Sequence, residues 1–170
     1  MISVAQGTEY RKSDIIIFTG TEEIPCPICR GELRVHGTCR RKVRRENGEE
    51  VYRLRVMKCK ECGKTHRELP AGIVPYKRMD AQLLCAISEV SKEGNLEETE
   101  VSTWKRVKDW VTWFFAYAQA VLQSVEVSLG QTIPTSPSDD PLSRKLTYYV
   151  RLVVNSGQWI QHRSAMRHGM

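Results

Sequence analysis

Four of the six cysteines in this 170-residue chain form two Cys-x-x-Cys pairs. The first pair is Cys26 and Cys29, and the second is Cys59 and Cys62. Each pair places two thiolates on one tight turn, and two such turns can surround a Zn²⁺ ion tetrahedrally. Because four protein ligands leave no coordination position open, we predict one structural zinc ion rather than a catalytic one. Disulfides or thiol redox chemistry are the alternative.

Other cysteines and histidines lie near these pairs in the sequence. His36 and His66 could each replace one cysteine as a ligand, although a histidine on a hairpin is more often an ordinary surface residue. Cys39 belongs to a basic strand and Cys85 to an apolar helix. We therefore expect Cys39 to be exposed and Cys85 to be a small core residue.

The second cysteine pair and the chain that precedes it belong to the most basic stretch of the protein. Residues 30–67 contain 13 Lys and Arg against five Asp and Glu, in a chain of net charge +6. A dense cluster of cations on a rigid support is what phosphate binding requires, and a solvated strand face is the alternative. The predicted phosphate contacts are Arg34, Arg40, Arg41, Lys42, Arg44, Arg45, Arg53 and Arg55.

Two strands, over 33–45 and 50–58, position these groups. Asn47 and Gly48 lie between them and predict a hairpin turn, because both residues tolerate positive φ. Apolar and cationic residues alternate over 52–56. Since successive side chains of a strand point to opposite faces, the hairpin should have one apolar and one cationic face.

Two more short strands, over 14–19 and 65–69, complete the expected N-terminal domain. We place this domain, a zinc ribbon, at residues 14–72. Residues 1–13 and 158–170 are expected to be flexible tails.

The hydrophobic pattern changes from a period of two to a period of 3.6 beyond residue 79, which predicts helices. One helix is expected over 81–92, with Asp80 as its N-cap, and a longer one from Ser102 or Thr103 to Ser128. The predicted helical domain covers 79–157.

A last helix is expected to begin at Asp140 and Pro141, with Asp as N-cap and Pro at the first position, and to end at Gly157. The long helix carries a second apolar patch beside its main stripe. Either the last helix or a second copy of the chain could cover it. The residues of this predicted partner-binding patch are Trp110, Trp113 and Tyr117.

The first two helices also have the spacing of a helix-turn-helix, whose second helix reads base edges with its first residues. An ordinary helical bundle is the alternative. The predicted base contacts are Ser102, Thr103, Lys105 and Arg106. The expected fold is thus α+β: an N-terminal zinc ribbon, a β-hairpin with two CxxC knuckles, followed by an all-α helix-turn-helix-like bundle.

Residues 24–110 carry a series of short motifs in a fairly specific order. The series is Cys26-Pro-Ile-Cys, Arg34-Val-His-Gly, Cys59-Lys-Glu-Cys-Gly-Lys-Thr-His, Leu69-Pro and Val74-Pro-Tyr. It resembles the zinc-ribbon and helix-turn-helix N-terminal region of bacterial insertion-sequence transposases, and small related proteins of mobile elements. The resemblance implies recognition of element-end DNA. Such transposases also carry a catalytic domain with three separated carboxylates. The acidic residues beyond the ribbon are expected in helices, caps and loops, so they do not predict such a catalytic site.

Together these features predict a zinc-dependent, non-enzymatic protein that binds double-stranded DNA, as an accessory factor or regulator of a bacterial mobile element. Its expected partners are a transposase or integrase, or a second copy of the chain. Without an apparent signal peptide or membrane span, we expect it in the cytoplasm, associated with the nucleoid. The alternative function is a protein-interaction adaptor whose zinc ribbon is a scaffold and whose helical domain docks a partner. RNA binding ranks lower.

Overall fold

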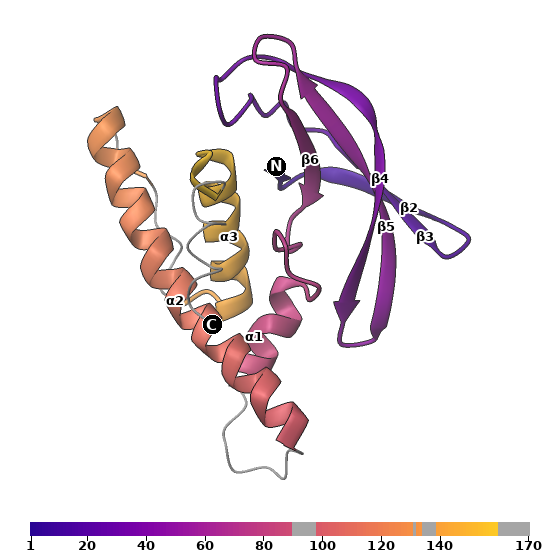
Figure 1. Ribbon diagram of the computed structural model, residues 1–170, viewed down its shortest axis with the longest axis vertical. Coiled ribbons are helices and arrows are strands. Elements are labelled where there is room, and N and C mark those ends of the chain that lie inside the picture. Colours follow the sequence, from indigo (N-terminus) through magenta and orange to yellow (C-terminus); the bar gives the residue numbers. More distant parts are fainter. Residues whose placement is uncertain (90–97, 131, 134–138, 160–170) are drawn as a thin grey trace.

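The computed structural model describes residues 1–89, 98–130, 132–133 and 139–159. In the described chain six strands precede three helices, and the helices lie on one side of a curled sheet (Figure 1). The strands are β1 (Ile2–Val4), β2 (Gly7–Lys12), β3 (Ile15–Gly20), β4 (Leu33–Arg45), β5 (Gly48–Cys59) and β6 (Thr65–Pro70). The helices are α1 (Ala81–Glu89), α2 (Glu98–Leu129) and α3 (Leu142–Asn155).

The predicted fold, a zinc ribbon followed by an all-α helix-turn-helix-like bundle, is wrong. The strands form a mixed sheet in the order β1-β6-β5-β3-β2, and β4 pairs with β5. One edge of β5 pairs with β4 along its whole length, whereas its other edge is divided between two partners. Residues 51–53 pair in parallel with β3, and residues 56–58 pair antiparallel with β6. The long β5 thus supports a larger sheet than a ribbon hairpin.

The predicted hairpin itself is confirmed as β4 and β5. Its turn contains Gly48 at φ 124°, a conformation that favours glycine. A bulge at His36 shifts the register of the two strands. The structure also places β1 and β2 in residues 1–13, for which the sequence suggested a flexible lead-in. β1 is buried because it pairs with β6 beneath α3.

The helical segments differ from a helix-turn-helix in length and in their first residues. α2 has 32 residues and begins at Glu98, so Ser102 and Thr103 lie in its second turn and not at its N-terminus. The predicted N-cap of α1 is confirmed, because the Leu83 N–H donates to Asp80 Oδ1 at 2.8 Å. The end of the predicted 81–92 helix lies partly outside the described residues.

The start of α3 corrects a second predicted cap. The N-cap residue is Pro141, which makes no side-chain cap, and helix α3 begins at Leu142. Asp140 pairs instead with Arg144, one turn into the helix, at 3.2 Å. The predicted end is confirmed, since Gly157 follows α3 at φ 82°.

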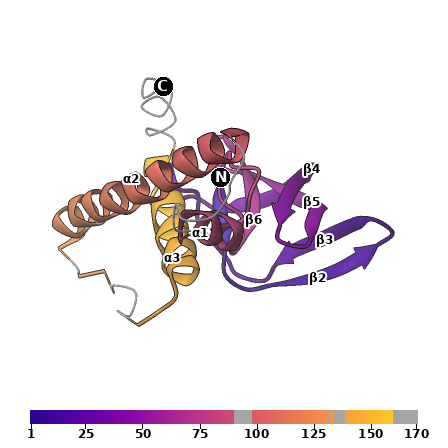
Figure 2. The ribbon, with the colours of Figure 1, turned by 90° about the horizontal axis from the view of Figure 1, so that it is seen from below.

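Helix α3 fastens the helices to the sheet. The Asn155 amide exchanges two hydrogen bonds of 2.9 Å with the backbone of Ser3, as a neighbouring strand would. Arg151 pairs with Glu22 at 2.6 Å. In Figure 2, α3 passes below α2 and lies beside α1, and its contact with the sheet is through β1. The described residues include no helix with an apolar stretch sufficient for a transmembrane span.

Candidate metal centre and cationic surface

The four predicted metal ligands meet at one point. The Sγ atoms of Cys26, Cys29, Cys59 and Cys62 all lie within 4.8 Å of one another. The distance is 3.7 Å between Cys26 and Cys62 and 3.4 Å between Cys29 and Cys59. Zinc–sulfur bonds of about 2.3 Å in a tetrahedron separate the sulfur atoms by about 3.8 Å. The four thiols therefore fit one metal ion, and this set of donors suits zinc.

Two backbone turns bring the thiols together. In the first, the Arg30 N–H donates to the Cys26 carbonyl at 2.8 Å, and Arg30 takes a φ of 65°. In the second, the Cys59 N–H donates to the Lys64 carbonyl at 2.9 Å, and Gly63 takes a φ of 68°. The residue after each cysteine pair thus adopts the left-handed backbone conformation, although only the second of these residues is glycine. A hydrogen bond from the Lys60 N–H to the Glu32 carbonyl, at 3.0 Å, joins the turns.

His66 lies beside the cluster and not in the set of four. Its Nε2 is 3.4 Å from Cys26 Sγ, and its Nδ1 is 3.2 Å from the Met1 nitrogen. Burial, aided by the charge of the Met1 ammonium, lowers the pKa of His66 to about 4. If the Met1 ammonium donates to Nδ1, the neutral ring carries its proton on Nε2 and directs it to the sulfur. Such a donor orients a thiolate ligand. His36, the other predicted substitute ligand, is exposed on β4.

The remaining two cysteines lie away from the cluster. Cys85 is buried in α1, where burial raises the pKa of its thiol to about 12. Cys39 is only partly exposed, because it packs against the core of the sheet. All six cysteines lie in described parts of the chain, and none of them forms a disulfide there.

The cationic surface is one face of the β4–β5 hairpin, which we call the outer face. By alternation and register it carries Arg40, Lys42, Arg44 and Arg53, with Glu49 opposite Arg44. Arg55 lies on the same side of β5, but it is paired with Glu68 of β6. Arg40 lies directly opposite Arg53, although like charges in that position destabilise a sheet. Lys42 pairs with Glu49 at 2.8 Å. Arg40, Arg44 and Arg53 make no ion pair with any described residue.

Three other predicted phosphate contacts are engaged within the protein. Arg41 donates to the carbonyls of Val74 and Lys77 at 2.6 and 2.8 Å, which ties the chain after β6 to β4. Arg45 lies between Glu50, at 3.1 Å, and Asp80, at 3.4 Å. Arg41 and Arg45 thus have structural roles, and the sequence pattern alone does not distinguish such arginines from arginines that bind phosphate.

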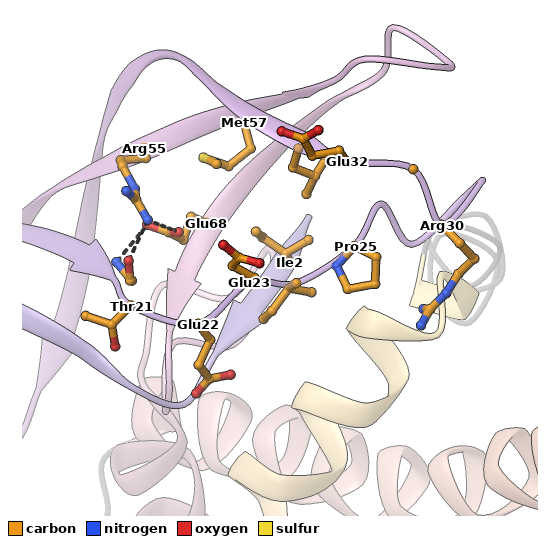
Figure 3. A pocket seen from close by; sticks show the side chains of 14 residues that line it. Ile2, Thr21, Glu22, Glu23, Pro25, Arg30, Glu32, Arg55, Met57 and Glu68 are labelled. Atoms are coloured by element: carbon orange, nitrogen blue, oxygen red, sulfur yellow. Dashed lines mark hydrogen bonds and ion pairs between the residues drawn. The ribbon is translucent and has the colours of Figure 1, made fainter.

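Arg55 is the third engaged arginine, and Figure 3 shows its contacts. Its Nε and one terminal nitrogen donate to the two carboxylate oxygens of Glu68 at 2.8 and 2.7 Å. It also donates to the Gly20 carbonyl at 2.7 Å. This pair lines a pocket of about 560 Å³, whose rim includes Glu23 and Arg30. Since the Glu68 side chain is only 2% exposed, the pair joins β5 to β6 in the interior.

The remaining predicted nucleic-acid contacts are near the surface. Arg34 is exposed on β4, opposite Lys58. On α2, Ser102, Lys105 and Arg106 are exposed, while Thr103 is partly buried. The structure does not place them beside the outer residues of β4 as one continuous row, because α1 lies between α2 and the hairpin (Figures 1 and 2).

The predicted partner-binding aromatics are mostly covered by their own chain. Trp110 is buried and stacks on Phe114, with ring centroids 5.3 Å apart. Tyr117 donates its hydroxyl to the Gln158 carbonyl at 3.3 Å and stacks on Trp113. Trp113 remains 38% exposed. The end of α3 and the chain after it thus take part of the surface predicted for a partner.

Comparison with known protein families gives one match, over residues 26–107. The family is described as a domain of unknown function (DUF6431). The matched segment starts at the first metal-ligand cysteine and ends in α2, so it includes the four thiols and the whole β4–β5 hairpin. Searches of curated proteins and of solved structures found no significant match.

Proposed function

We propose that this protein is a zinc-dependent DNA-binding protein without catalytic activity of its own. The observation that carries the proposal is the pair of opposed arginines, Arg40 and Arg53, on the outer face of the hairpin. Their mutual repulsion costs stability, and no described carboxylate offsets it. Phosphate groups of a nucleic acid would do so, and Arg44 lies on the same face.

Zinc has a structural part in this proposal. The four thiols lie at one end of β4 and β5 and the turn at Gly48 at the other, a separation of roughly 40 Å for a 12-residue strand. β4 is exposed along much of its length, whereas β5 buries Tyr52, Leu54 and Met57, so the core holds β4 less firmly than β5. A metal ion bound by both turns would fix the register of β4 against β5, and with it the positions of the arginines.

The order of motifs in residues 24–110 supports a role beside a bacterial mobile element, where the DNA would be an element end. Double-stranded DNA is the proposed ligand because the cations are mounted on a long hairpin. Arg40, Lys42 and Arg44 lie on β4, which pairs with no other described strand than β5, so the phosphates of a duplex can reach them at this edge of the sheet.

The test is fluorescence anisotropy with a mixed-sequence DNA duplex at several salt concentrations, on protein whose zinc content is measured by mass spectrometry. We expect about one zinc per chain and an affinity that falls steeply with salt. The double variant Arg40→Gln/Arg53→Gln should lower the salt slope by roughly two, because each lost phosphate contact removes about 0.9. The control is Arg144→Gln, which removes an exposed cation from α3. Equal slopes in the two variants would refute the assignment to the outer face.

A further inference from the structure

A second cationic feature lies away from the hairpin, in a small pocket beside α2. The pocket has a volume of about 240 Å³, and Lys77, Arg78 and Arg106 are among its lining residues. Lys77 and Arg78 come from the chain between β6 and α1, and Arg106 comes from the third turn of α2. Ligand pockets for drug-sized molecules are usually about 300–1,000 Å³. This one has room for a small ion or a single group of a larger ligand.

The charges of the pocket are of one sign. Three cations contribute to its walls, and no carboxylate is among its described lining residues. Lys77 is half-buried, and burial lowers the pKa of its ammonium group. Its ammonium group contacts an aromatic ring: Nζ lies 4.3 Å from the centroid of the Trp110 ring. A partly desolvated cation without a carboxylate is costly, and a bound anion would offset that cost.

The polar groups of the wall add hydrogen-bonding capacity to this charge. Trp110 is 8% exposed and lines the pocket with its ring beside Lys77, while its Nε1 atom is buried. Thr103 also lines the pocket with Arg106. Such a set suits a tetrahedral oxyanion with several acceptor oxygens.

The segment that supplies Lys77 and Arg78 to the pocket is joined to β4 through its backbone. The Arg44 N–H donates to the Arg78 carbonyl at 2.6 Å, and the Asp80 N–H donates to the Arg44 carbonyl at 3.2 Å. The residues that bring Lys77 and Arg78 to the pocket are therefore bound to the edge of β4.

We propose that this pocket binds a phosphate group. The source can be a backbone phosphate of DNA, which rests on the proposed function, or a free phosphate or small phosphorylated molecule, which does not. In either case Arg78 and Arg106 make the charged contacts, and Lys77 contributes from the wall.

The test compares Arg106→Gln and Arg78→Gln with Lys108→Gln, which removes a neighbouring cation of α2 outside the pocket. In one arm, inorganic phosphate is titrated calorimetrically at constant ionic strength, with chloride as the reference anion. In the other, duplex DNA is titrated at several salt concentrations. Circular dichroism checks that each variant is folded. In the phosphate arm we expect affinity to fall at least fivefold in each pocket variant and to be unchanged in Lys108→Gln.

In the DNA arm, a backbone phosphate in the pocket predicts a salt slope lower by about one in Arg106→Gln than in Lys108→Gln. A change in the DNA arm alone supports the DNA source, and a change in the phosphate arm alone supports a free phosphorylated ligand. No difference between pocket and control variants in either arm overturns the proposal. If the unmodified protein binds no DNA, the proposed function fails, and the phosphate arm alone decides whether the pocket is a phosphate site.

Discussion

Arg53 and Arg55 are two residues apart on one strand, and substituting each should have a different kind of effect. Arg53 lies on the outer face, opposite Arg40, and makes no ion pair with a described residue. Arg55 instead makes a two-pronged ion pair with Glu68. We therefore predict that Arg55→Gln destabilises the fold, whereas Arg53→Gln weakens DNA binding and leaves stability nearly unchanged.

The loss of stability in Arg55→Gln can be estimated from the buried Glu68 carboxylate, which the substitution leaves without its ion-pair partner. The Glu68 carboxylate is 2% exposed and would keep only the hydrogen bond from the Gly20 N–H, at 3.1 Å. Removing one partner of a fully buried pair costs about 3–5 kcal/mol. Because the Arg55 side chain is 23% exposed, water can partly replace it, and we reduce the expected cost to about 2–4 kcal/mol. For a chain of this size that lowers the melting temperature by roughly 5–15 °C.

The assay is urea unfolding of zinc-loaded protein followed by tryptophan fluorescence, with thermal unfolding as a second measure. Arg53 is half-buried, and Arg53→Gln removes its repulsion with Arg40, so the stability should stay close to that of the unmodified protein or rise by up to about 1 kcal/mol. The double variant Arg55→Gln/Glu68→Gln should be more stable than Arg55→Gln alone, because it no longer buries an unpaired carboxylate. Equal stability of Arg53→Gln and Arg55→Gln, or strictly additive losses in the double variant, would refute the structural assignment of Arg55.

Three further predictions test other parts of the structure. Chelation of the metal, or Cys59→Ser, should separate the two cysteine turns and lower the melting temperature, with a loss of β signal in circular dichroism; unchanged unfolding would contradict a structural metal. Gly157→Ala should cost roughly 2 kcal/mol in urea unfolding, because φ is 82° and an added Cβ would overlap the Pro27 carbonyl oxygen; a neutral result would mean that the end of α3 does not rest on the first cysteine turn. Burial raises the pKa of Tyr52 to about 12, so folding keeps this phenol protonated, and stability should fall as pH rises from about 10 to 12. Tyr52→Phe should show a smaller fall over that range, and the same slope in both proteins would argue against the raised pKa.

Several features of this protein follow from local sequence alone. The two Cys-x-x-Cys pairs specify two thiol-bearing turns, and Asn47-Gly48 between strand-like runs specifies a hairpin. The Asp80 cap and the 3.6-residue spacing place α1 and α2 to within a few residues. These predictions succeeded because each depends on neighbours in the chain, through turn geometry, side-chain alternation or helix periodicity.

The tertiary structure decided which residues pair across the chain. β1 is three residues long and becomes a strand because β6 and α3 cover it, which no local pattern reveals. The division of one edge of β5 between β3 and β6 turned an expected ribbon into a mixed sheet. The tertiary structure also determines the roles of the arginines. Arg53 and Arg55 belong to the same alternating run, but only Arg55 pairs with a buried carboxylate. The ion-pair partner of a charged residue on a strand depends on which residues pack near it. A partner that is 13 or more residues away in the sequence is determined by tertiary packing and not by local spacing.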